Sequence, residues 1–219
     1  MTKKFSLISL SLLIMIAAAI GFTPIFKLQT ILCQVDVDPC PPELITYLSQ
    51  LKTRNLLFIN RSRLAKDLKA LYPDFQNTRI FINLPHMLRV ALTSRTPVAL
   101  LVTGSGQTFP IDNSGTVLKS ASPANLPVIK LATPGAQLLT ASLNLLTLLN
   151  QAFIGLTSLS STQSGVLDVE LSSGQLARFS LLKDLPVQVS SLQVILHKST
   201  IVPPASIIDV RFDKPVLVN

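Results

Sequence analysis

Few side chains in this chain of 219 residues are of the types that do chemistry in enzymes, and those few are scattered. His86 and His197 stand in stretches typical of a turn and a helix end, and neither has a carboxylate or a cysteine at metal-ligand spacing. Asp168 and Glu170 lie two apart on a predicted strand and share a face, but solvated strand positions explain them more simply than acid and base catalysis. We therefore expect no enzymatic activity, cofactor, metal site or small-molecule substrate.

The remaining reactive side chains are two cysteines, Cys33 and Cys40. In an exported protein they can form a disulfide between the end of a strand and the start of a helix. Closing so short a loop is worth about 2 to 3 kcal/mol in the chain-entropy model. Two unpaired thiols are the alternative, and the sequence leaves that choice open.

The sequence predicts a membrane anchor. Residues 5–22 carry no charge and follow Lys3 and Lys4. At about 1.5 Å per residue this run extends about 27 Å, close to the hydrocarbon thickness of a bilayer. The positive charge before the run predicts a cytoplasmic N-terminus. We expect a cytoplasmic tail at 1–4, a transmembrane helix at 5–25 and an exported remainder, as in a single-pass plasma-membrane protein. A cleaved signal peptide is the alternative, because alanines follow one another at positions 17 to 19.

Charge is concentrated next to this anchor. Residues 26–96 contain ten Lys and Arg against five Asp and Glu, whereas residues 97–219 contain seven against six. Anionic lipid headgroups or acidic segments of a partner are suitable ligands for such a region, but an ordinary solvated surface is the default explanation for these lysines and arginines. Nucleic acid is not expected as a partner, because only 5% of the residues are aromatic.

The elements that must position any site are those of an α+β protein with two exported domains. Leucines at helical spacing predict two helices before residue 73, with Asn60 capping the second, and the period then changes from helical to alternating. For the first domain we expect a strand at 28–37, a helix around 44–51, an extended piece at 55–59, a helix at 61–71, and strands around 79–83 and 88–93.

The sequence pattern of the second domain is typical of a mainly antiparallel β domain with flanking helices. Glycine-containing turns at 104–106, 112–115 and 172–174 separate its short strands. We expect strands at 98–102, 107–111, 116–118, 126–131, 166–171, 176–181, 207–212 and 216–218, and helices around 139–153 and 187–196.

Five short motifs occur in a recognisable order. They are Asn-Leu-Leu-Phe-Ile-Asn at 55–60, Leu-Pro at 84–85 before Leu-Arg-Val-Ala-Leu at 88–92, Arg-Thr-Pro-Val-Ala at 95–99, Phe-Pro-Ile-Asp before Gly-Thr-Val-Leu within 109–118, and Ile-Asp-Val-Arg-Phe at 208–212. In order and spacing they resemble the FtsQ/DivIB family of bacterial cell-division proteins. Ser94 and Asn60 stand where that family often has Glu and Asp, and the cysteine pair is not part of its pattern.

The resemblance implies a polypeptide-transport-associated (POTRA) type domain of order β-α-α-β-β at 26–96 and an FtsQ-type β domain at 97–219. It also implies a membrane-anchored scaffold of the division machinery, or divisome, that takes part in septum formation and has FtsB-like and FtsL-like coiled-coil partners. Two alternatives are a POTRA protein of export or envelope assembly and an exported wall-modifying enzyme. By the resemblance, the partner-binding residues are Ile207, Ile208, Asp209, Val210, Arg211, Phe212, Val216, Leu217 and Val218.

Overall fold

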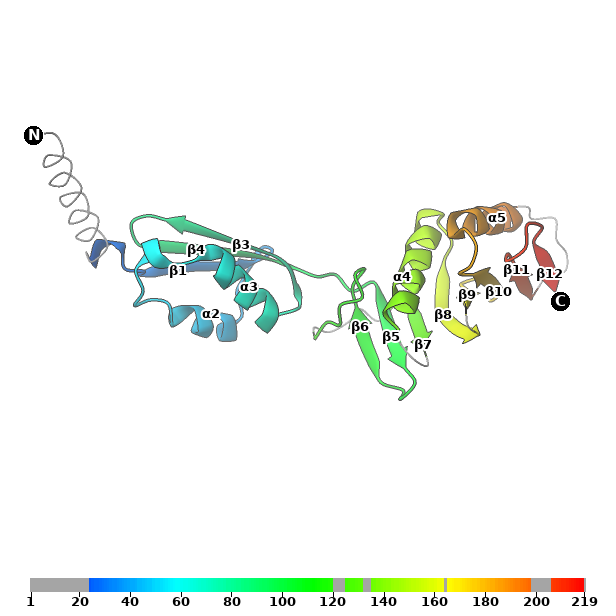
Figure 1. Cartoon of the computed structure of the whole chain (residues 1–219), viewed down its shortest axis with the longest axis horizontal. Helices are drawn as coiled ribbons and strands as arrows, with labels where there is room; N and C mark the ends of the chain where they lie inside the picture. Colours follow the sequence, from blue (N-terminus) through cyan, green and yellow to red (C-terminus); the bar gives the residue numbers. More distant parts are fainter. Residues whose placement is uncertain (1–23, 120–124, 132–134, 164, 198–205, 219) are drawn as a thin grey trace, which may run out of the picture. The chain divides into compact units, whose positions relative to one another are not determined.

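The computed structural model describes residues 24–119, 125–131, 135–163, 165–197 and 206–218 (Figure 1). The chain divides between Arg95 and Thr96 into two compact units, which we call unit 1 and unit 2. The α+β prediction is confirmed, because the described residues form four α-helices and two mixed sheets. Apart from its last two residues, the expected membrane helix at 5–25 lies outside the described residues. No helix among the described residues has the length and apolar character needed to cross a bilayer.

Unit 1 has the expected order of strand, helix, helix, strand and strand. After a short 3-10 helix, η1 (Pro24–Phe26), its strands pair in the order β2-β1-β4-β3, with β1 parallel to β4 and the other pairs antiparallel. The remaining elements are β1 (Thr30–Val35), β2 (Asp38–Pro39), α2 (Pro42–Ser49), η2 (Leu56–Phe58), α3 (Arg61–Leu71), β3 (Phe75–Asn83) and β4 (Met87–Ser94).

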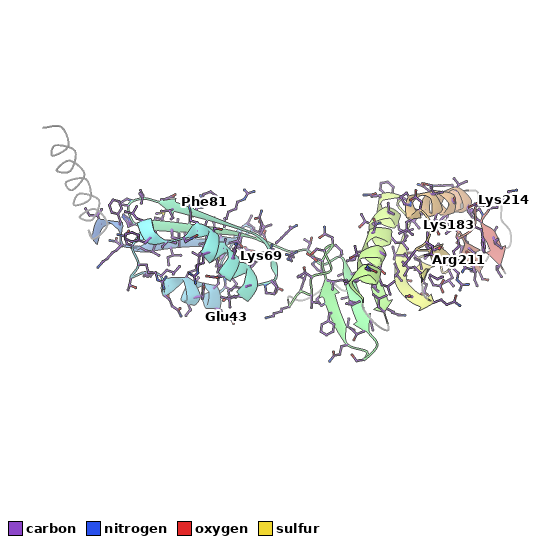
Figure 2. The ribbon with its side chains drawn as sticks, viewed as in Figure 1. Glu43, Lys69, Phe81, Lys183, Arg211 and Lys214 are labelled. Carbon is purple, nitrogen blue, oxygen red and sulfur yellow. A yellow bond between two sulfur atoms is a disulfide. The ribbon has the colours of Figure 1, made fainter. Side chains whose placement is uncertain are left out.

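The two helices of unit 1 begin where the sequence predicts and bury their leucines against the sheet. Pro42 occupies the first turn of α2, and the side chain of Asn60 accepts a 3.0 Å hydrogen bond from the backbone N–H of Arg63 at the start of α3. Leu48 and Leu68 are completely buried in the core. Figure 2 shows Phe81 on the face of the sheet away from α2 and α3, so the helices cover one face only.

The extended piece expected at 55–59 is wrong. The side chain of Asn55 accepts a 2.9 Å hydrogen bond from the backbone N–H of Leu57 and caps the 3-10 turn η2, which the backbone bond from the N–H of Phe58 to the C=O of Asn55 closes at 3.1 Å. The turn buries Leu56 and leaves Leu57 and Phe58 exposed. The two asparagines of the segment therefore each cap a short helical element.

The structure joins Cys33 and Cys40 by a disulfide, with 5.4 Å between their Cα atoms. The antiparallel register pairs Gln34 with Pro39, so the next residues outward, the two cysteines, face each other across the β1–β2 turn. Asp36 makes that turn with a positive φ of 54°. The disulfide therefore closes a hairpin whose register already brings the thiols together.

Unit 2 is built on one mixed sheet of order β12-β11-β10-β9-β8-β7-β5-β6. Four of its strand pairs are antiparallel and three are parallel, so the expectation of a mainly antiparallel domain is too narrow. Its elements are β5 (Ala99–Thr103), β6 (Thr108–Ile111), β7 (Val128–Leu131), α4 (Ala136–Gln151), β8 (Leu156–Gln163), β9 (Val166–Leu171), β10 (Leu176–Ser180), α5 (Leu185–His197), β11 (Ile207–Asp209) and β12 (Val216–Val218).

Three details of unit 2 differ from the sequence-based expectation. The strand β8 was not predicted, although it lies between β7 and β9 and buries Leu159. The segment 116–118 makes a single bridge, from Val117 to Ile111, and no strand. The closing strand expected at 207–212 ends at Asp209, because the carboxylate of Asp209 accepts the backbone N–H of Arg211 and turns the chain away from the ladder.

Candidate partner-binding edge

The last strand of the chain lies at one edge of the unit 2 sheet. β12 pairs with β11 alone, and in the described residues no strand lies on its outer side. Val216, Leu217 and Val218 are each at least 41% exposed. An edge strand presents unpaired backbone N–H and C=O groups, so β12 offers a template for another extended chain.

β11 holds this edge strand on the core of unit 2. Ile208 and Val210 are 1% exposed and belong to the core cluster that also contains Phe179 of β10. β11 runs parallel to β10, with Ile208 opposite Ala177. β11 is therefore a structural element, and of these two strands only β12 has a side without a partner strand.

A row of charges crosses the strands beside the edge. Arg178 of β10 lies opposite Asp168 of β9 on one side and Asp209 of β11 on the other. Its guanidinium binds Asp168 with two hydrogen bonds, Nε to Oδ1 at 2.7 Å and Nη2 to Oδ2 at 3.2 Å. Asp209 in turn accepts hydrogen bonds from Nε and Nη2 of Arg211, the shortest at 2.7 Å. Bidentate pairs of this kind fix both partners in one geometry.

The contacts in this row shift the pKa values of Asp209, Arg178 and Arg211. Burial alone raises the pKa of Asp209, but the hydrogen bonds from the side chain and backbone of Arg211, together with the charges of Arg211 and Arg178, hold that pKa below its usual value. The hydrogen bond to Asp168 raises the pKa of Arg178, and the hydrogen bond to Asp209 raises the pKa of Arg211. All of these groups are therefore charged at neutral pH.

Two further contacts position the segments around β11 and β12. The buried side chain of Gln188 in α5 accepts the backbone N–H of Ser180 and donates to its C=O, each at 2.8 Å, and so pins α5 to the end of β10. Lys183 donates to Asp213 at 2.9 Å on the surface and links the loop after β10 to the β11–β12 turn. This hydrogen bond and the positive charge of Lys183 lower the pKa of Asp213.

Exposed apolar and cationic side chains gather next to the edge. Phe212 is exposed, and the centroid of its ring lies 5.5 Å from the guanidinium carbon of Arg211. Figure 2 shows Lys183, Arg211 and Lys214 at the end of unit 2 that carries β11 and β12. The surroundings of the edge therefore suit a segment with apolar and acidic side chains.

The structure separates the nine predicted partner-binding residues into two groups. Ile208, Asp209 and Val210 are buried, so they support the edge and have little surface to offer. The other six are exposed or half-buried; they are Ile207, Arg211, Phe212, Val216, Leu217 and Val218. Sequence reasoning missed Lys214, because a single exposed lysine in a turn carries no periodic signal.

Asp168 and Glu170, which the sequence offered as a candidate acid and base pair, take part in structural contacts. Asp168 is 5% exposed and ion-paired, so its interpretation as a solvated strand position is wrong. Glu170 is exposed and accepts a 3.0 Å hydrogen bond from the hydroxyl of Ser158. Within the described ranges no three His, Cys, Asp or Glu side chains are grouped so that they could hold a metal ion.

Compared with known proteins, the chain matches no family model and no curated protein sequence.

Proposed function

We propose that this protein is a membrane-anchored scaffold of the bacterial division machinery, similar to FtsQ/DivIB, which binds another division protein by adding a strand to β12. The observation that carries the proposal is the position of β12, a sheet edge with exposed apolar side chains held on a buried neighbouring strand. The proposed partner is an FtsB-like or FtsL-like membrane protein, and the proposed location is the plasma membrane with an exported bulk.

The length and chemistry of the edge define what could bind. Three residues at about 3.3 Å each make a strand of about 10 Å, so the backbone pairing is short. Side-chain contacts must supply the rest of the affinity, with Phe212 available for apolar contacts and Lys214 for acidic ones. We therefore expect a partner segment that is extended, partly apolar and acidic.

The order of elements in unit 1 supports the same assignment. The strand, helix, helix, strand and strand of this unit agree with the POTRA-type domain that the motifs imply. In this proposal unit 1 is that POTRA-type domain and unit 2 the FtsQ-type β domain. Residues 5–25 hold both at the membrane, where their partners are anchored too.

A truncation tests the edge directly. Ending the chain after Pro204 would remove Ile208 and Val210 from the core, so loss of binding there would have two explanations. Ending it after Pro215 removes β12 alone, whose three side chains are exposed. We expect the chain shortened at Pro215 to keep its circular dichroism spectrum and to lose co-purification of the FtsB-like and FtsL-like proteins from its host membranes.

A photo-crosslinking residue locates the contact. Placed at Val216 or Val218 in the full-length protein, it should form a product with a small membrane-anchored division protein. Placed at Phe153, which is 95% exposed elsewhere in unit 2, it should not. Undiminished co-purification by the shortened chain, or equal products from both places, contradicts strand addition. A fluorescent fusion that stays away from the division site contradicts the divisome role itself.

A further inference from the structure

The described chain begins at one end of unit 1. Two of the segments that connect the helices and strands of this unit lie at the same end. Lys27 bridges to Asn55, and the backbone N–H of Leu28 donates to the C=O of Arg54 at 3.1 Å. These contacts place η1 beside the segment that links α2 to α3. The chain therefore enters unit 1 next to η2.

The β3–β4 turn joins the same end. The backbone N–H of Gln29 donates to the C=O of His86 at 3.0 Å, and Figure 1 shows this turn beside the blue entry segment and the start of α3. We call this surface the entry end. Its members are Ile25, Lys27, Lys52, Arg54, Leu57, Phe58, Arg61, Arg63 and Leu84.

Four of these members are large apolar side chains that face solvent. Phe58 is 76% exposed, Ile25 60%, Leu84 56% and Leu57 46%. They come from η1, η2 and the β3–β4 turn, three separate connections that meet at one end. Apolar side chains that gather on a surface in this way mark an interaction site, whereas scattered ones need no explanation.

The other five members are cations, and all five are exposed. Within the described residues no salt bridge involves any of them. Two of them, Arg54 and Arg63, line a hollow of about 560 Å³ together with Phe58. Guanidinium groups in such a position suit phosphate oxygens.

Four of the five acidic residues of unit 1 lie away from the entry end. Asp36 and Asp38 flank the turn after β1, and Glu43 stands in the first turn of α2, at the opposite end from the entry point. Asp74 precedes β3 at that same opposite end, and only Asp67, further along α3, shares the hollow with Arg63. The entry end is therefore cationic, whereas the other end carries acidic residues together with the cations Lys69 and Arg95.

We propose that the entry end of unit 1 seats in the headgroup region of an anionic bilayer. This inference rests on the anchoring that the proposed function includes, because the apolar run at 5–22 ends two residues before Pro24 and so holds the entry end at the membrane surface. Exposed apolar side chains from three connections suit shallow insertion among lipids, and the surrounding cations suit anionic headgroups. An acidic peptide would bind the cations but would leave Ile25 and Leu84 in water.

The chain contains no tryptophan, so a Phe58→Trp variant carries a single reporter at the entry end. The full-length variant is reconstituted into phosphatidylcholine vesicles, with or without about 30% phosphatidylglycerol, that contain lipids brominated near the top of the acyl chain. We expect about twofold or more quenching of the tryptophan when phosphatidylglycerol is present, and loss of that increase in about 0.5 M salt.

Matched variants separate an effect of the cations at the entry end from an effect of the overall charge of unit 1. In the Phe58→Trp background, Arg54→Glu/Arg63→Glu should abolish the increase. Lys69→Glu/Arg79→Glu, which reverses two exposed cations of the same unit away from the entry end, should preserve it. A Val37→Trp reporter, in the exposed turn after β1 at the opposite end, should not be quenched in either membrane.

Equal quenching in both membranes, or none, overturns the proposal. So does a shift of the Phe58→Trp emission by a Glu-rich peptide when phosphatidylglycerol has no effect, which would make the entry end a peptide site. Failure of the chain to float with the vesicles rejects the anchoring and therefore this inference with it. Partner capture by β12, measured on the same vesicles, reports separately on strand addition.

Discussion

Asp209 of β11 stands opposite Val216 of β12, so a residue with a buried carboxylate pairs directly with the exposed edge strand. The carboxylate is balanced by Arg211, two residues later in the chain, and by Arg178 on the neighbouring strand. The geometry of the accessible strand therefore depends on an ion-pair row that lies behind it.

Removing Arg211 should weaken the edge. In Arg211→Ala the Asp209 carboxylate loses the hydrogen bonds from Nε and Nη2 of Arg211 while it stays buried, and we expect unit 2 to lose about 1 to 3 kcal/mol in its free energy of unfolding. Denaturant unfolding at pH 7 measures the change.

The double variant Asp209→Asn/Arg211→Ala should recover part of that loss, because no charge is then left without its partner. Lys183→Ala, which breaks an exposed pair with Asp213, serves as the control and should leave the unfolding midpoint unchanged. A loss of equal size in both single variants would contradict a special role for the buried pair.

Asp209 should titrate below its usual pKa of 3.8. Because its pKa is lower in the folded protein, the unfolded chain takes up the proton first as the pH falls. The resulting stabilisation is complete above the unfolded pKa and is lost as the pH falls through the folded one. Carbon NMR of the Asp209 carboxyl group should give a midpoint below 3.8, and Arg211→Ala should raise it. An unchanged midpoint in that variant would show that Arg211 does not set the pKa.

The disulfide should stabilise unit 1 alone. Closing the loop between Cys33 and Cys40 is worth about 2.5 kcal/mol in the chain-entropy model, and the Cys33→Ser/Cys40→Ser variant should lose about that much. Reducing the wild-type protein should reproduce the loss, and the unfolding of unit 2 should not change. Two free thiols found by titration of the unfolded, unreduced protein would show that the disulfide does not form in solution.

The local elements of this fold could be predicted from the sequence because their signals are local. Leucines at helical spacing predict α2 and α3, and Asn60 marks the start of α3 by the same hydrogen bond that the structure contains. The turns at Gly106 and Gly115 follow from residue type as well, since both glycines adopt a positive φ. Such features depend on a few neighbouring residues.

The pairing of strands that lie far apart in the sequence cannot be predicted from local signals of this kind. The strand β8 reads Leu-Thr-Ser-Leu-Ser-Ser-Thr-Gln, too polar for an alternating pattern, and it forms because β7 and β9 supply partners on both sides. The parallel pairing of β10 with β11 likewise depends on where the chain returns after α5.

The candidate site was predictable only in part for the same reason. The closing motif marks the residues of β11, but the sequence does not tell a buried supporting strand from an exposed edge. Asp168 and Arg178 are ten residues apart, and only the β9–β10 register brings them together beside Asp209.

A strained residue ends α4. Phe153 has a positive φ of 57°, and the backbone N–H of the next residue, Ile154, donates to the C=O of Leu149 at 2.9 Å in the usual helix-ending pattern. Glycine is the common residue at this position because a side chain costs about 1 to 2 kcal/mol in the left-handed conformation. The ring of Phe153 is almost fully exposed and returns little packing energy.

Phe153→Gly should therefore raise the free energy of unfolding of unit 2 by up to about 1 kcal/mol, after the extra backbone freedom of glycine in the unfolded chain is deducted. Phe153→Ala removes the ring but keeps the strain, so the difference between the two variants isolates the backbone term. Denaturant unfolding of both variants beside the wild type gives that difference. Equal stability of the glycine and alanine variants would contradict the strain argument.

Gly115 allows the reverse substitution to be tested, because here a glycine already occupies a position with a positive φ. It has a positive φ of 78°, and a Cβ placed there would lie 3.1 Å from Cδ2 of Leu139. Gly115→Ala combines the conformational cost with crowding against α4, so we expect it to destabilise unit 2 by about 1 to 2 kcal/mol. Measured under the same conditions, the substitution toward glycine should stabilise and the substitution away from it should destabilise. An unchanged free energy of unfolding in Gly115→Ala would contradict this argument. Relaxation of the turn to a negative φ would not remove the cost, because the buried Asp112 would then lose the hydrogen bonds that it accepts from the backbone N–H groups of Ser114 and Thr116.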